Sequence, residues 1–238
     1  MADAINHWTS HGVMAGWLLT FAMAHSGLAA LRPRGEKIMG ARLYRVLFAL
    51  VSLPLAVVLL IYFFNHRYDG VQFWNLQGVP GVGALVWVLS ALSFLLLYPA
   101  TFNLLEVAAI ARPQIHLYES GVIRITRHPQ AWGQILWCLA HFLWIGSSFM
   151  LVASLGLIAH HLFAIWHGDR RWLAKHGEAF LALKERTSIV PFRAVLAGKQ
   201  KLAWHEFFRP AYGGVLVAVL VFRWLHPIAS QGFAQIPW

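Results

Sequence analysis

The chain has 238 residues, of which 59% are hydrophobic and 12% are charged, and its mean hydropathy is +0.59. A soluble globular domain carries about 25% charged residues, so this composition excludes an ordinary water-soluble domain and a disordered chain. The net charge of +10 does not by itself indicate a nucleic-acid partner, because basic residues of membrane proteins gather in cytoplasmic loops. The composition predicts a multi-pass membrane protein in contact with membrane lipids, and no nucleic-acid partner.

Six apolar runs are candidates for membrane spans. A hydrocarbon core about 30 Å thick needs roughly 20 apolar residues in a helix that rises about 1.5 Å per residue. The runs are, in chain order, Val13–Leu31, Tyr44–Phe64, a segment within Val82–Leu105, Ala131–Ser147, Phe149–His167 and Tyr212–Pro227. The fourth and fifth runs almost touch, and Gly146-Ser147-Ser148 is expected to form the turn of a tight hairpin. We predict an all-α fold, a polytopic transmembrane helix bundle of about six spans that forms a single domain over residues 1–238.

The basic residues predict how this bundle lies in the membrane. Of the 19 Lys and Arg residues, 17 lie around the loops after the first, third and fifth spans, and the exceptions are Arg67 and Arg223. By the positive-inside rule these loops face the cytoplasm, and both termini face away from it. The apolar spacing over Asp169–Arg186 adds a cytoplasmic amphipathic helix between the last two spans. The protein is expected in a bacterial inner membrane, or in a plastid membrane if it is eukaryotic.

Histidines inside the spans are the first candidates for chemistry, because an ionisable residue in hydrocarbon is rare and is expected to face the protein interior. The candidates are His25, His141, His160 and His161. Counted from the span ends, His25, His141 and His160 all fall near the membrane midplane. Two imidazoles on different helices can ligate iron, copper or zinc, and a bis-histidine haem suits a region without carboxylates better than zinc does. The alternative is that each histidine is a hydrogen-bonded packing residue, and depth alone does not choose His141 over His160 or His161.

Cys138 is the only cysteine. A single cysteine excludes an intramolecular disulfide, a CxxC redox pair and covalent haem attachment, so any haem is bound non-covalently. Cys138 precedes His141 by three residues and is expected on the same helical face. It is either an alternative axial ligand or a small buried apolar side chain.

Two short polar segments favour a different chemistry. Arg127-His128-Pro129-Gln130 precedes the fourth span and Asp169-Arg170-Arg171 follows the fifth. They resemble the segments with which membrane methyltransferases bind S-adenosylmethionine, although Gly168-Asp169 stands where those enzymes have a glutamate pair. Pro129 equally suits the start of a helix, which makes the first segment a helix-entry turn. A membrane methyltransferase is therefore one alternative function.

Longer stretches resemble the zeta-carotene isomerase family, which is related to the bacterial NnrU membrane proteins. The resemblance covers residues 12–201 and fades at the last span, 212–227. The matching stretches are HSGLAALR at 25–32, GARLYRVLFALVSLPLAVVLLIYFFNHRYDG at 40–70, WNLQGVPGV at 74–82, LYPATFNLLE at 97–106, IRITRHPQAWGQILWCLAHFLWIGSSF at 123–149, HHLFAIWHGDRRWLAKHGEAF at 160–180 and TSIVPF at 187–192.

The resemblance implies an integral membrane isomerase of carotenoid biosynthesis that contains haem b. Its lipophilic substrate would be 9,15,9′-tri-cis-zeta-carotene, isomerised at the central 15–15′ double bond to 9,9′-di-cis-zeta-carotene. By matching motif positions, the resemblance implies His25 and His141 as catalytic residues that ligate the haem iron, with Cys138 as a candidate ligand in the oxidised state. The reduced iron would be the active form, and no redox partner is identified. A non-catalytic NnrU-type membrane haem protein, in electron transfer or nitrogen-oxide metabolism, is the other open function.

Overall fold

The computed structural model describes residues 2–101, 119–208 and 210–236. These ranges are helical apart from turns, loops and one isolated β-bridge between Gln72 and Ser147. The helices are α1 (Ala2–Met39), α2 (Ala41–His66), α3 (Val82–Thr101), α5 (Val122–Ile125), α6 (Pro129–Ile145), α7 (Ser148–His176), α8 (Glu178–Arg186), α9 (Arg193–Leu196), the 3-10 helix η1 (Trp204–Phe208) and α10 (Pro210–Ala234). The predicted all-α fold is confirmed.

Each of the six predicted spans overlaps one of the longer helices. By length and composition, four of the described helices are suited to cross a membrane, namely α1, α2, α7 and α10. The other two predicted spans correspond to α3 and α6. Helix α6 has 17 residues and is about 25 Å long, at the lower limit for a span. Residues 102–106, which belong to the LYPATFNLLE stretch and include the end of the third predicted span, lie outside the described residues.

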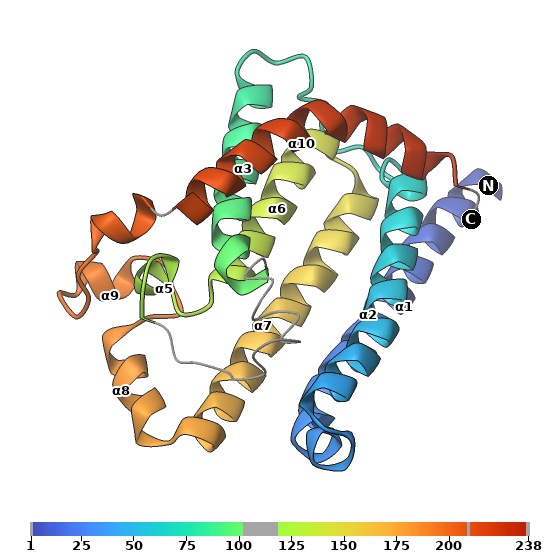
Figure 1. Ribbon diagram of the computed structural model, residues 1–238. Coiled ribbons are helices and arrows are strands. Elements are labelled where there is room, and N and C mark those ends of the chain that lie inside the picture. Colours follow the sequence, from blue (N-terminus) through green and yellow to red (C-terminus); the bar gives the residue numbers. More distant parts are fainter. Residues whose placement is uncertain (1, 102–118, 209, 237–238) are drawn as a thin grey trace.

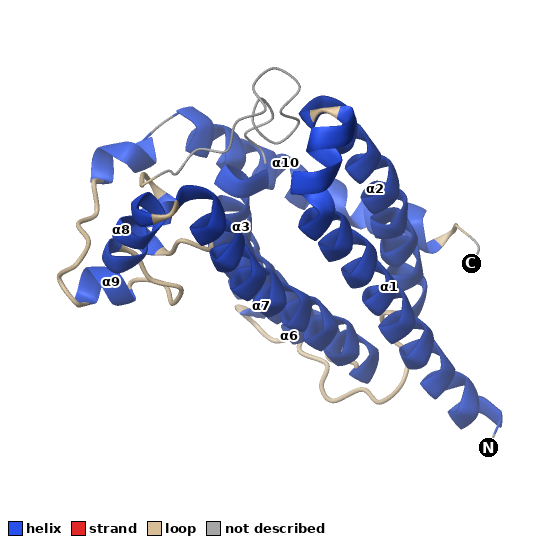
Figure 2. Ribbon diagram, turned by 90° about the horizontal axis from the view of Figure 1, so that it is seen from below, coloured by secondary structure: helices blue, strands red, loops and turns tan. Residues whose placement is uncertain are grey.

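Helix α7 joins two helix pairs into one bundle (Figure 1). Helix α1 packs along α2 and α7, while α6 packs along α3 and α7. Figure 2 shows the short helices α8 and α9 grouped to one side of this bundle. Helix α10 crosses the bundle obliquely in Figure 1, contacting α3 and then α2.

The predicted hairpin turn between α6 and α7 is confirmed. Gly146 ends α6 in a left-handed conformation with φ of +69°, and the Ser147 hydroxyl accepts a hydrogen bond from the Met150 amide at 3.0 Å, which caps α7. The loop that follows α2 closes over this turn, because the Val71 amide donates to the Ser148 hydroxyl at 2.9 Å. Backbone hydrogen bonds from Ser148 to Val71 (2.8 Å) and from Phe73 to Gly146 (2.7 Å) fix the same contact.

The predicted amphipathic helix over Asp169–Arg186 is wrong in its bounds. Residues 169–176 continue α7 without a break, and a separate helix, α8, begins only at Glu178. The break falls at Gly177, whose φ of +51° a residue with a side chain rarely adopts. Polar residues can extend a helix beyond its apolar part, so the change in composition at His167 does not end α7.

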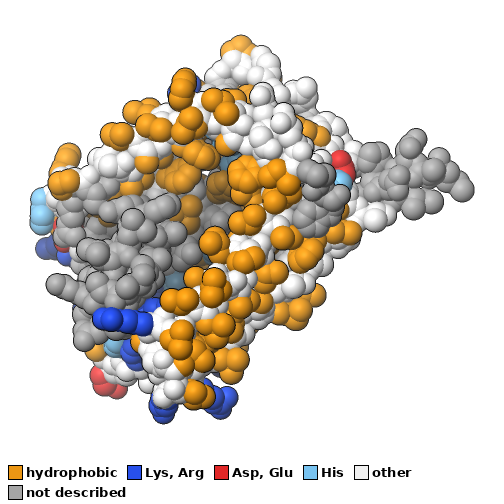
Figure 3. Space-filling view, turned by 45° about the vertical axis from the view of Figure 1, so that its right-hand side comes forward, with side chains coloured by type: hydrophobic (Ala, Val, Ile, Leu, Met, Phe, Trp, Pro, Cys, Tyr) orange, Lys and Arg blue, Asp and Glu red, His pale blue; other side chains and the backbone are white. Residues whose placement is uncertain are grey.

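Exposed apolar side chains identify the surface that faces lipid. Large hydrophobic residues on α1, α2 and α10, including Met23, Leu53 and Leu220, are more than 60% exposed. Hydrophobic side chains cover much of the face shown in Figure 3, and most of the visible Lys and Arg side chains lie toward its lower end. A water-soluble monomer rarely exposes so extended an apolar surface, which agrees with a membrane protein.

Both described ends of the chain lie at the same end of the bundle. The Phe233 ring near the end of α10 stacks on Phe64 of α2 at 5.5 Å, and the Tyr62 hydroxyl donates to the Ser10 carbonyl of α1 at 3.3 Å. This agrees with termini on one side of the membrane. Which side they face stays a prediction.

Candidate functional site

His25 lies in a cluster of rings between α1, α2 and α7. Its ring is 4.7 Å from that of Phe48 on α2 and 5.8 Å from that of His160 on α7, and the His161 ring follows at 5.5 Å from His160. The His25 Nδ1 atom and the Ser52 hydroxyl are hydrogen-bonded at 3.2 Å. A histidine held through one ring nitrogen can present the other to a ligand, and hydroxyl or carbonyl partners of this kind commonly orient metal-binding histidines.

His141 is separate from this cluster. Its ring stacks on Trp137 at 3.9 Å and lies 6.3 Å from the ring of His226 on α10. The His141 Nδ1–H donates to the Trp137 carbonyl at 2.9 Å, so the neutral ring carries no proton on Nε2 and this atom is chemically able to bind a metal. Each predicted ligand is therefore held through its Nδ1 atom, so its Nε2 atom can bind a metal.

The two predicted ligands do not meet. His141 lies four residues before the end of α6, whereas His160 lies twelve residues after the start of α7, on the other side of the same turn. At about 1.5 Å per residue these positions differ in height by about 12 Å, and His25 is level with His160. Imidazole nitrogens bind a metal at about 2 Å, so two axial histidines have their nitrogens about 4 Å apart.

The different levels of His25 and His141 therefore do not support their pairing as ligands of one haem in this arrangement of the helices. The predicted common depth holds for His25 and His160, while His141 lies closer to the α6–α7 turn. Nor does any group of three or more His, Cys, Asp or Glu within residues 2–101, 119–208 and 210–236 have the geometry to hold a metal ion. Haem ligation by this pair stays a prediction based on the resemblance.

Cys138 is buried between α6 and α7. Its sulfur accepts a hydrogen bond from the Gln134 side chain at 3.7 Å, and the thiol contacts the Ser154 carbonyl at 4.0 Å. This environment resembles that of a small buried packing residue. The role of Cys138 as an iron ligand stays a prediction.

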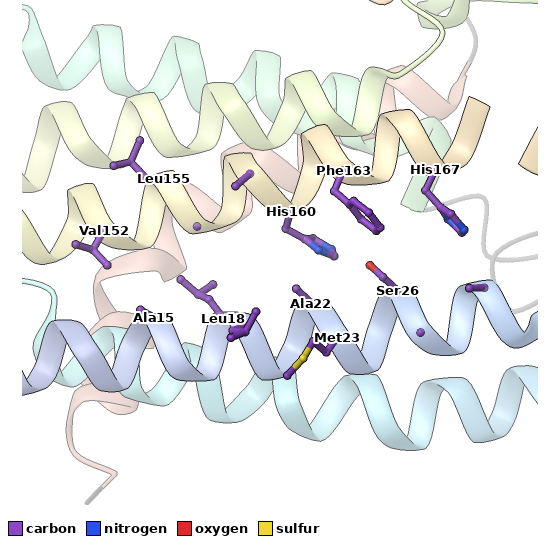
Figure 4. A pocket seen from close by; sticks show the side chains of 15 residues that line it. Ala15, Leu18, Ala22, Met23, Ser26, Val152, Leu155, His160, Phe163 and His167 are labelled. Atoms are coloured by element: carbon purple, nitrogen blue, oxygen red, sulfur yellow. The ribbon is translucent and has the colours of Figure 1, made fainter. Parts of the chain in front are cut away.

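An apolar groove of about 840 Å³ runs between α1 and α7 (Figure 4). His160 and Phe163 project from α7 toward α1, where Ala22 and Ser26 lie opposite them. The helices approach closely near one end of the groove, since a Cβ added to Gly156 would be 2.6 Å from the Leu18 side chain. Of the ring cluster around His25, His160 is the member that also lines this groove.

The two polar segments that suggested a methyltransferase meet at the opposite end of the bundle from the α6–α7 turn. Arg127 donates to Asp169 at 2.8 Å, and the His128 Nε2–H donates to the other oxygen of the same carboxylate at 2.8 Å. All three side chains are mostly buried. The carboxylate is therefore engaged in an ion-pair network that ties the start of α6 to α7. Pro129 is the first residue of α6, as the helix-entry alternative expected, while the contact with Asp169 was not foreseen.

A comparison with protein families shows to which family the chain belongs. The family model described as "NnrU protein" matches residues 13–231. The chain belongs to the NnrU family. The match extends beyond residue 201, where the resemblance was expected to fade, and includes most of α10.

Two named relatives of this NnrU protein carry the same description. The chain is 54% identical over 229 residues to "15-cis-zeta-carotene isomerase, chloroplastic" of Zea mays, which covers 95% of this chain and 63% of that protein. It is 53% identical over 224 residues to the Arabidopsis thaliana protein of the same name, covering 93% of this chain and 61% of that protein. The chain thus spans less than two thirds of the length of these relatives. No solved structure matches the chain significantly.

Two site neighbours and one further histidine contact were missing from the sequence prediction. His226, a neighbour of His141, lies within the predicted sixth span. A histidine inside an apolar span is a signal in itself, and it could have identified this residue. Ser52 beside His25, and His11, whose Nε2 is 2.9 Å from the Ser148 hydroxyl, had no comparable signal. A serine in an apolar run and a histidine near a span end become informative only once their partners on other helices are known.

Proposed function

We propose that this NnrU protein isomerises the central 15–15′ double bond of 9,15,9′-tri-cis-zeta-carotene from cis to trans, giving 9,9′-di-cis-zeta-carotene. The observation that carries the proposal is the identity of 53–54% over more than nine tenths of the chain with proteins named 15-cis-zeta-carotene isomerase. The exposed apolar surface of the bundle supports a substrate that is dissolved in lipid.

The helices have a definite part in such a reaction. Rotation about a double bond needs its bond order to be lowered while one half of the chain stays free to turn against the other, and the protein's part is to hold and orient the substrate. An apolar site between membrane helices excludes water and receives the substrate laterally from the bilayer. The His25 cluster lies level with the middle of the α1–α7 groove, where His160 connects the two.

The test is expression of the full chain in cells that accumulate tri-cis-zeta-carotene, kept in the dark so that light does not isomerise the pigment. Chromatography should show conversion to the di-cis isomer. Accumulation of the tri-cis isomer at the level of cells without the protein would contradict the proposal and favour a non-catalytic NnrU-type protein.

Haem b, active when reduced, is the cofactor that we propose from the resemblance, and an absorbance spectrum tests it separately. The purified wild-type protein should show a Soret band. We expect His25→Ala to change this band, because Ser52 orients the His25 ring. A change in His141→Ala as well would mean that α6 moves relative to α1 when haem binds, since the two histidines lie at different levels here. A band that is unchanged in both variants would exclude both residues as ligands.

A further inference from the structure

Three arginines on three helices lie together at the end of the bundle where α1 ends and α2 begins. The Nδ1 atom of His25 on α1 and the hydroxyl of Ser52 on α2 are hydrogen-bonded at 3.2 Å. Arg32 lies seven residues after His25, and Arg45 lies seven residues before Ser52. Seven residues make about two helical turns, so Arg32 and Arg45 face each other about 10 Å nearer to the helix ends.

Arg171 of α7 completes this group. It lies eleven residues after His160, which is about three helical turns. Arg171 therefore lies on the same side of α7 as His160, which projects toward α1 (Figure 4). The Arg171 Nη1–H donates to the Ala29 carbonyl of α1 at 3.5 Å. The Arg32 guanidinium interacts electrostatically with those of both other arginines, so the three residues form one arginine cluster.

The positive charge of the arginine cluster is only partly balanced. The carboxylate that interacts with these arginines is that of Glu36, which lies 3.6 Å from the Arg32 Nε atom, beyond hydrogen-bond distance. Within the described part of the chain, this buried Nε atom has no hydrogen-bond acceptor. Three guanidinium groups and one carboxylate leave a net charge of +2. Like charges held this close repel one another, so an anion bound between them would stabilise the cluster.

The arginine cluster lies at a height where lipid phosphates are found. Arg45 is about one turn from the start of α2, and Arg32 is about two turns from the end of α1. The ends of membrane-spanning helices lie near the headgroups, and basic pockets between such helices bind anionic lipids. None of the three arginines is fully buried, so a headgroup can reach them from the bilayer.

The apolar groove between α1 and α7 opens to lipid beside the arginine cluster. Arg171 continues the row of α7 side chains that line the groove, one turn after His167. The groove is not enclosed, since its lining residues Met23 and Phe163 are 61% and 47% exposed. A flexible acyl chain can pack on an open apolar surface of this kind, and a phosphate on Arg171 would place its acyl chains there.

We propose that the arginine cluster binds the phosphate of an anionic phospholipid. A guanidinium group can donate two parallel hydrogen bonds to phosphate oxygens, which makes arginine well suited to this ligand. The Arg32 guanidinium lies 5.8 Å from the centre of the Phe48 ring, and this ring contacts His25 at 4.7 Å. The lipid would therefore hold α1, α2 and α7 together beside the His25 ring cluster. This inference does not depend on the isomerase proposal.

A lipid titration of charge variants tests the site. The purified full chain in dodecyl maltoside is titrated with dioleoyl phosphatidylglycerol, and the rise in Tm gives an apparent Kd. Arg171→Gln should raise this Kd about tenfold, because a charged hydrogen bond to the phosphate is lost. Arg170→Gln is the matched control. The Arg170 guanidinium lies over the Trp166 ring at 4.4 Å, and its loss should leave the Kd within about twofold.

The opposite change in charge should have the opposite effect. Glu36→Gln removes the carboxylate from the arginine cluster and should lower the Kd about threefold. In lipid-free protein, Arg171→Gln should not lower the Tm, because it removes one of three like charges. A Tm that falls equally with and without phosphatidylglycerol would show that Arg171 is a packing residue of α7 and would overturn the proposal.

The identity of the anion is tested with other ligands. Dioleoyl phosphatidylcholine, whose choline group cancels the phosphate charge, should stabilise the protein much less, and equal stabilisation would overturn the proposal. Inorganic phosphate should also have a much smaller effect, since it lacks acyl chains, and an equal effect would overturn the assignment to a lipid. If Arg171→Gln and Arg170→Gln bind phosphatidylglycerol equally and only Arg171→Gln loses haem absorbance, the arginine cluster binds carboxylates of the cofactor instead.

Discussion

The histidines in the middle of the bundle and the histidine at its polar end have different partners. His128 donates to Asp169, which also binds Arg127, and the network joins α6 to α7. His25 is held by the neutral hydroxyl of Ser52, and His160 contacts other rings. The carboxylate beside His128 is shared with the Arg127 guanidinium, whereas the hydroxyl beside His25 is neutral and comes from a neighbouring helix. The comparison teaches that histidines of the same chain lie in different surroundings, one in a charged network between helix ends and the others among rings and a hydroxyl.

The largest effect on the free energy of unfolding is expected at the polar end of the bundle, where Arg127 and His128 bind Asp169. Asp169→Ala leaves Arg127 and His128 mostly buried without their carboxylate, and breaking a buried pair in this way costs about 3–5 kcal/mol. The measurement is the free energy of unfolding of the purified protein. Asp69→Ala is the control, because the His66–Asp69 pair is more exposed, and its loss should cost about 1 kcal/mol or less. Equal losses in the two variants would show that Asp169 is not a structural tie.

Where α3 packs on α6, the free energy of unfolding is expected to depend on side-chain volume rather than on charge. A Cβ added to Gly133 of α6 would lie 2.7 Å from Leu97 and 2.9 Å from the Ser93 carbonyl of α3. Gly133→Val should therefore lower the free energy of unfolding by about 1–3 kcal/mol, because it separates closely packed helices. Gly213→Val on α10 is the control, since a Cβ there meets no atom within 4 Å. If both variants lose the same stability, close packing of α3 on α6 does not contribute to the stability of the bundle.

A smaller effect tests how His25 is held. Ser52→Ala removes the hydrogen bond to His25 Nδ1 and should cost about 0.5–1.5 kcal/mol. The control is Ser90→Ala, whose hydroxyl donates to the Val86 carbonyl of its own helix. Nitrogen NMR of labelled histidines should show a shifted His25 signal in Ser52→Ala only. An unchanged signal would mean that the hydroxyl does not orient the ring.

The smallest effect on stability is expected when the pH is lowered, and it concerns Glu119 at the polar end of the bundle. A hydrogen bond from Arg186 holds the pKa of Glu119 below its usual value. A carboxyl group with a lowered pKa stabilises the fold above its unfolded pKa of about 4.3, and this stability is lost as the pH falls through the lower folded value. Because the Arg186 side chain is half exposed, the contribution is modest. The slope of thermal stability against pH below about 4 should be shallower in Glu119→Gln than in the wild type.

Much of the fold could be predicted from the chain itself. Runs of apolar residues located the six long helices, and Gly146-Ser147-Ser148 located the hairpin turn, because both signals are local. The end of α7 could not be located in this way. Its last residues are polar and still helical, and the break comes at Gly177, where backbone conformation rather than polarity changes.

The candidate site was predicted less completely. The residues in it were identified by type, since histidines in apolar helices are unusual. The pairing of His25 with His141 came from the resemblance, and their common depth was counted from span ends, so it carries the error of those ends. The structure joins His25 with His160 and leaves His141 nearer the α6–α7 turn.

The sequence by itself determined an apolar helical protein of the NnrU type, with its histidines and single cysteine inside helices. Only the tertiary structure decided which of these residues share a level, that Asp169 is bound by Arg127 and His128, and that a groove lies between α1 and α7. The reason is physical. Helix formation follows from local periodicity, whereas the register of one helix against another is set by contacts between distant residues, such as Leu18 against Gly156, which local patterns do not encode.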